Sequence, residues 1–93
     1  MSGGGWEGMN VDVVENQARQ LQHLAEQTKN LISKIDGEIA RLAENWHGDD
    51  SKKFHSEWEG QHKHSLTQSA HILEQMGQSA QQQAHQQKQT SAG

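Results

Sequence analysis

The chain has 93 residues, only 30% of them hydrophobic, and a formal net charge of -4 at pH 7. A chain this short and polar has little apolar surface with which to stabilise a monomer, so a partner or a second copy is expected. The acidic balance, with no basic stripe, argues against nucleic-acid binding. The absence of cysteine excludes disulfides, thiolate metal sites and a cysteine nucleophile.

The composition favours an all-α fold, because proline is absent and strand-forming residues are scarce. The glycine-rich segment 1–10 is expected to be a flexible tail. It has neither the basic start nor the apolar run of a secretory signal peptide, and no stretch of the chain reaches membrane-spanning length. Any export is therefore expected to use another route.

A heptad pattern predicts a first helix over about residues 12–46, capped by Asn10 or Asp12. The stripe alternates steps of three and four residues and consists of Val14, Ala18, Leu21, Ala25, Thr28, Ile32, Ile35, Ile39, Leu42 and Trp46. Leu24 and Leu31 widen it on one flank. The apolar face is thus broad enough to contact two neighbours.

A turn at about residues 46–49 and a second helix at about 50–83 follow. Gly48 supplies a flexible backbone position, and Asp49, Asp50 and Ser51 are good residues for a helix start. The apolar face of the second helix comprises Phe54, Trp58, Leu66, Ala70, Leu73, Met76 and Ala80, with one eight-residue gap that His62 fills.

Two helices of roughly 50 Å each, joined by a tight turn, predict an antiparallel hairpin. The end of the chain has no side chain large enough to anchor it. Residues 86–93 are therefore expected to form a flexible tail.

Each of the three tryptophans precedes a glycine by two residues, but their contexts differ. Trp46 ends the heptad stripe, and Gly48 and the capping residues follow it, as a helix-turn-helix junction requires. Trp58 shares a helical face with Phe54 and is expected in the core. Trp6 lies among glycines, where no role is its simplest interpretation and a contact with a groove or partner is the alternative.

These features resemble the W-x-G family of roughly hundred-residue helical hairpin proteins that type VII secretion exports early. The resemblance covers about residues 11–85. It rests on Val11-Asp12, the long heptad helix, Trp46-x-Gly48 near mid-chain, and the spacing of Gly48, Phe54 and Trp58. The tripeptide alone is weak evidence. Its position between two matched amphipathic helices is more specific.

The resemblance implies a four-helix bundle of two hairpins, formed with a second copy or a paralogous W-x-G protein. It also implies export in the folded state through a membrane-bound, FtsK-like secretion ATPase, from the cytoplasm to the outside or the cell envelope. Family members carry a two-part signal, the Trp-x-Gly turn and a Tyr-x-x-x-Asp/Glu motif after the second helix. This chain contains no tyrosine. A partner chain or another tail sequence would have to supply the second part.

The site residues that follow are the secretion-signal turn, Trp46 and Gly48, and the core of the hairpin or dimer. That core is expected to comprise Leu21, Ile32, Ile35, Ile39, Leu42, Phe54, Trp58, Leu66, Leu73 and Met76. No catalytic residue, metal ligand or cofactor is predicted, since neither a Ser-His-Asp arrangement nor a phosphate-binding glycine loop is present.

Three other interpretations stay open. Seven histidines raise the question of a metal site, but none are four residues apart on a helix, and pH sensitivity through His62 in the seam is the stronger alternative. A cytoplasmic coiled-coil adaptor without a link to secretion competes with the secretion hypothesis. A membrane-active hairpin fits an acidic chain poorly, and stable membrane insertion is not expected.

Overall fold

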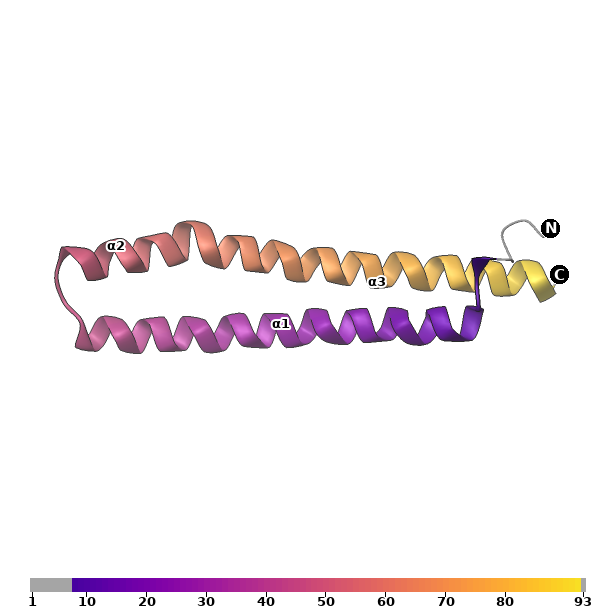
Figure 1. Cartoon of the computed structure of the whole chain (residues 1–93), viewed down its shortest axis with the longest axis horizontal. Helices are drawn as coiled ribbons and strands as arrows, with labels where there is room; N and C mark the ends of the chain where they lie inside the picture. Colours follow the sequence, from indigo (N-terminus) through magenta and orange to yellow (C-terminus); the bar gives the residue numbers. More distant parts are fainter. Residues whose placement is uncertain (1–7, 93) are drawn as a thin grey trace.

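The computed structural model describes residues 8–92, which form two antiparallel helical rods joined at one end (Figure 1). The first rod is α1 (Val11–Asn45). The second comprises α2 (Asp49–Glu57), the π-helix η2 (Trp58–His62) and α3 (Lys63–Ala92). The described residues contain no strand, and the predicted all-α hairpin is confirmed.

Capping residues set the two ends of α1. Asn10 is the N-cap of the two candidates, because its side chain accepts a hydrogen bond from the backbone N–H of Val13 at 3.4 Å. The helix stops at Asn45, because Trp46 has an extended backbone, with φ -137° and ψ 110°. Both ends lie within one residue of the predicted bounds.

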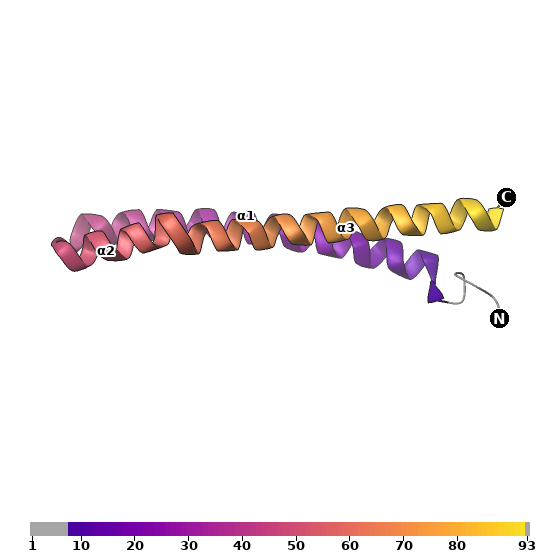
Figure 2. The same ribbon diagram turned by 90° about the horizontal axis from the view of Figure 1, so that it is seen from above.

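Small residues form the inner seam between the rods. Ala18 and Ala25 on α1, and Ala70, Gly77 and Ala84 on α3, are all buried and recur every seven residues. Two large side chains, Ile32 and Trp58, are the only ones buried in the described part of the chain. The rods can therefore approach closely, and they cross at a shallow angle over most of their length (Figure 2).

Polar contacts across the seam fix the antiparallel register. Lys29 pairs with Glu74 at 3.1 Å, and Lys88 pairs with Glu15 at 3.4 Å. Between them, the side-chain amide of Gln22 donates to that of Gln81 at 3.1 Å. These contacts place the end of α3 beside the start of α1.

The second rod continues to Ala92, so the prediction of a helix end near residue 83 is wrong, and the predicted tail is helical as far as Ala92. The absence of large side chains does not matter here, because the seam is built from small ones. Ala84 is fully buried, Lys88 reaches Glu15, and glutamine is a good helix former. Gly93 lies outside the described residues.

Most of the predicted N-terminal tail, including Trp6, also lies outside the described residues. Among the helices that the structure describes, none combines the length and the apolar character needed to cross a membrane.

Candidate functional site

The turn between α1 and α2 brings Trp46 and Gly48 to the tip of the hairpin. Gly48 is the N-cap of α2 and has a φ of 112°, the single positive φ among the described residues. Residues with a side chain rarely adopt that conformation, whereas glycine does so freely. The backbone conformation of the turn therefore favours glycine at position 48.

The expected side-chain cap of the second helix is not formed. Gly48 contributes only its backbone, whose carbonyl accepts from the N–H of Lys52 at 3.2 Å. Asp49 and Asp50 lie in the first turn of α2, where negative charge favours the positive end of the helix dipole. Ser51 is buried against the tip instead of capping the helix.

The Trp46 indole is displayed at the tip, with 38% of its surface exposed. It contacts Phe54 of α2, with the ring centroids 5.6 Å apart and the planes tilted by 54°. Phe54 is itself exposed. The two rings thus form an exposed aromatic pair that joins the turn to α2.

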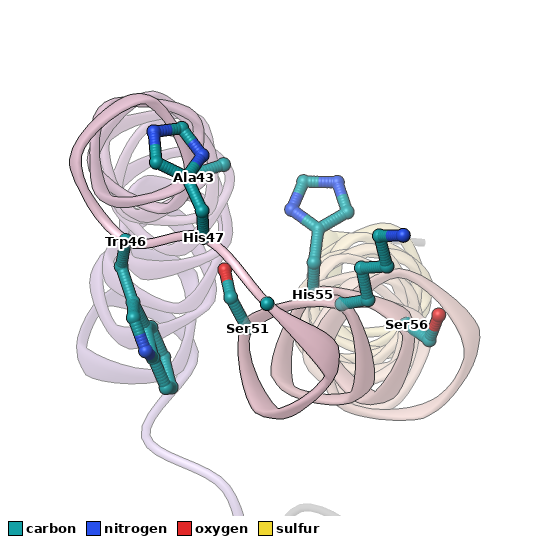
Figure 3. Close-up of a pocket in the computed structure, with 8 residues that line it drawn as sticks. Ala43, Trp46, His47, Ser51, His55 and Ser56 are labelled. Carbon is teal, nitrogen blue, oxygen red and sulfur yellow. The ribbon is translucent and has the colours of Figure 1, made fainter.

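An open cleft of about 700 Å³ separates the end of α1 from α2. It is lined by Ala43, Trp46, His47, Gly48, Ser51, Lys52, His55 and Ser56. In Figure 3 the His47 and His55 rings extend to one side of the tip, and the Trp46 indole extends to the other. The Nδ1 atom of His55 is buried and has no hydrogen-bond partner among the described residues.

Trp58, unlike Trp46, is a buried residue inside the second rod, with 6% of its surface exposed. Its indole N–H donates to Asp36 Oδ1 at 2.9 Å, and Lys63 Nζ donates to Asp36 Oδ2, also at 2.9 Å. These two hydrogen bonds, that of Trp58 first, lower the pKa of Asp36 below its usual value. Asp36 in turn raises the pKa of Lys63.

The remaining predicted core residues fall into two groups. Leu21, Ile35, Ile39 and Leu73 are half-buried, whereas Leu42, Phe54, Leu66 and Met76 are exposed. Within one hairpin, therefore, only Ile32 and Trp58 of the predicted set lie in the core. Sequence reasoning missed Gly77 and the Asp36–Lys63 pair, although small residues at 70, 77 and 84 have visible heptad spacing.

Histidine does not occupy the inner seam at the predicted position. His62 is exposed, and Lys63 occupies the half-buried place opposite Asp36. Within one hairpin, His62 therefore lies outside the inner seam. The described residues contain no group of three or more side chains arranged to hold a metal ion.

Comparison with known proteins identifies one family. The family model for proteins of 100 residues with WXG matches residues 8–90. No curated protein and no solved structure matches the chain.

Proposed function

The chain belongs to the WXG100 family, which is associated with type VII secretion substrates, and we propose that it is such a substrate or a co-secretion partner. It acts as a folded dimer, and Trp46-x-Gly48 forms part of its secretion signal. The protein leaves the cytoplasm for the outside of the cell or the cell envelope.

The display of Trp46 carries the part of the proposal that concerns the signal. A tryptophan that only closed the end of the hairpin would be expected to bury its indole, as Trp58 does. Trp46 instead exposes 38% of its surface beside the exposed Phe54. Exposed aromatic groups are favourable anchors for a protein partner. The proposed partner for this surface is the FtsK-like ATPase of the secretion system.

An uncovered apolar flank supports the dimer. Leu24, Leu31 and Leu42 lie on α1 beside the inner seam and are exposed. Helical periodicity places Met76, which is also exposed, on the same side of the hairpin. The flank consists of Val13, Leu24, Leu31, Leu42, Leu73 and Met76. A second hairpin, of this chain or of a paralogous W-x-G protein, would cover it and complete a four-helix bundle.

Export of a Trp46→Ala variant tests the signal. We expect the amount of intact protein in the culture supernatant to fall at least tenfold, because the anchor for recognition is lost. A half-exposed indole contributes less to stability than the 3–5 kcal/mol of a fully buried one. The free energy of unfolding of the purified variant, measured in urea, should therefore fall by only about 1 kcal/mol.

Two comparisons separate recognition from folding. His47→Ala changes the opposite side of the same tip and should be exported normally. A strain without the secretion ATPase should retain the wild-type protein inside the cell. Normal export of the Trp46→Ala variant would refute the role of the turn. A wild-type protein that stays inside the cell even when the ATPase is present would favour a cytoplasmic adaptor.

A further inference from the structure

The inner seam of the second rod contains one irregular step. Its buried residues Ser51, Trp58, Ala70, Gly77 and Ala84 are separated by seven, twelve, seven and seven residues. In an α-helix seven residues make almost two turns and eleven make about three, so both keep the same face. Twelve residues make about three and a third turns, so the last residue lies about a third of a turn away from the face of the first. A regular α-helix would therefore turn either Trp58 or Ala70 out of the seam.

The π-helix η2 absorbs the extra residue. The N–H of Lys63 bonds to the carbonyl of Trp58, five residues earlier, so this turn holds one residue more than an α-helical turn. The wider turn is visible between the α2 and α3 labels in Figure 1. Gly60 lies inside it and is exposed, and a Cβ atom added there would have no atom within 4 Å. One residue of η2 is thus an insertion that packs against no other element.

The two sides of this insertion are held differently. α3 is tied to α1 by the close seam at Gly77 and by the Lys29–Glu74, Gln22–Gln81 and Lys88–Glu15 contacts. Between α1 and α2, by contrast, the described residues form no hydrogen bond or ion pair, and the open cleft lies between them. Phe54 is exposed as well. α2 is therefore the weakly attached part of the second rod.

Asp36 stands at the boundary between these two parts. One of its oxygens accepts from Trp58 at the start of η2, and the other accepts from Lys63 just after it. A single carboxylate of α1 thus holds both ends of the π-helix.

We propose that the turn and α2 form a tip that opens separately from the rest of the hairpin, hinged at η2 and latched by Asp36. Opening moves α2 away from the end of α1 and uncovers the faces that line the cleft. Irregular π turns are the places where a long helix deforms most easily. This motion belongs to the hairpin itself and does not depend on export.

Amide hydrogen exchange of the full chain tests the hinge, because local opening has its own free energy. We expect the amides of residues 52–60 to exchange as one group, at least tenfold faster than those of residues 70–84. Asp36→Ala should accelerate the first group a further tenfold or more and leave the second nearly unchanged. Equal exchange in the two segments, or equal acceleration of both, would overturn the proposal.

Deletion of Gly60 tests the insertion in the opposite direction. The shortened chain should form a continuous α-helix that keeps Trp58 and Ala70 in the seam, and the exchange of its tip should slow towards that of α3. Deletion of Gly37, an exposed glycine of the regular helix α1, is the matched control and should lower the melting temperature by rotating all later residues. If the two deletions destabilise the hairpin equally, or if the Gly60 deletion fails to fold, η2 is no insertion.

Discussion

At Gly77 the two rods lie in close contact. A Cβ atom at this position would lie 2.8 Å from Gln22 Cγ, 2.9 Å from the carbonyl oxygen of Ala18 and 3.3 Å from the Gln22 nitrogen. The glutamine side chain can move, but the backbone oxygen cannot without shifting α1. Glycine here serves packing, since its helical backbone needs no special freedom.

We therefore expect Gly77→Ala to lower the free energy of unfolding by about 1 kcal/mol, as overpacking outweighs the gain in helix propensity. Gly37→Ala is the control, because nothing lies within 4 Å of the added Cβ. It should raise the free energy of unfolding by about 1 kcal/mol. Urea titration of both variants measures the difference. An equal gain in both would show that the seam at Gly77 has room for a methyl group.

Asp36 makes the stability of the hairpin depend on pH. Its pKa is lowered in the folded state, chiefly by the hydrogen bonds from Trp58 and Lys63. The carboxylate therefore contributes stability above its ordinary pKa of 3.8. That contribution is lost as the pH falls through the lower, folded-state pKa.

The expected result is a melting temperature that falls from pH 5 downward, with the fall continuing below pH 3.8. Asp36→Asn should melt lower at pH 7 and show a shallower fall, because the amide carries no charge to lose. Glu44→Gln, a change at an exposed position of α1, should keep the wild-type slope. Thermal melts from pH 7 to pH 2.5 compare the three proteins. Parallel curves would mean that Asp36 does not govern the acid transition.

At the scale of the elements, the sequence predicts two helices and a turn because the heptad stripe and Gly48 are local signals. It also contains a sign of η2, the eight-residue gap after Trp58, which by itself indicates a polar stretch of a regular helix. Nothing in composition distinguishes that interpretation from an inserted residue. The irregular twelve-residue step from Trp58 to Ala70 becomes visible only once Ala70, Gly77 and Ala84 are recognised as the seam.

The sequence does not predict which residues of the apolar stripe face the inner seam and which face outward, and the reason is physical. A broad stripe indicates that two surfaces cover it, but it does not tell which residues each one covers. Large side chains gain most from burial, which favours them for the core of the hairpin. The hairpin instead uses alanine and glycine inside and leaves residues such as Leu31, with 56% exposure, and Met76, with 52%, outside.

At the scale of the molecule, that division predicts that folding and association are coupled. A single hairpin buries only Ile32 and Trp58 among the large side chains of its described residues, so we expect most of the hydrophobic stabilisation to come from a partner. For a dimer that unfolds to monomers, each tenfold rise in protein concentration raises the apparent free energy of unfolding by about 1.4 kcal/mol of dimer. The melting temperature of the protein expressed alone should therefore rise with concentration.

A double variant of the flank, Leu24→Gln with Leu31→Gln, should remove this dependence. Covering one leucine contributes roughly 2 kcal/mol, and the loss is repeated in each copy. Asn30→Gln, a change at an exposed position that lies about a third of a turn around α1 from both leucines, is the control and should behave as wild type. Sedimentation equilibrium measures the mass. A wild-type protein that is folded, monomeric and independent of concentration would refute the dimer, and an unfolded one would point to a paralogous partner.

The slender shape of the hairpin affects how its size can be measured. The molecule measures 65 × 17 × 15 Å, and its radius of gyration is 20.2 Å. A compact domain of this length would have a radius of gyration of about 12 Å. A rod experiences more friction in water than a sphere of the same mass, so a single hairpin would elute from a sizing column ahead of compact proteins of its own mass. Judged by elution volume alone, a monomeric hairpin could then be mistaken for a dimer. Light scattering measures the molar mass directly and does not depend on the shape of the particle.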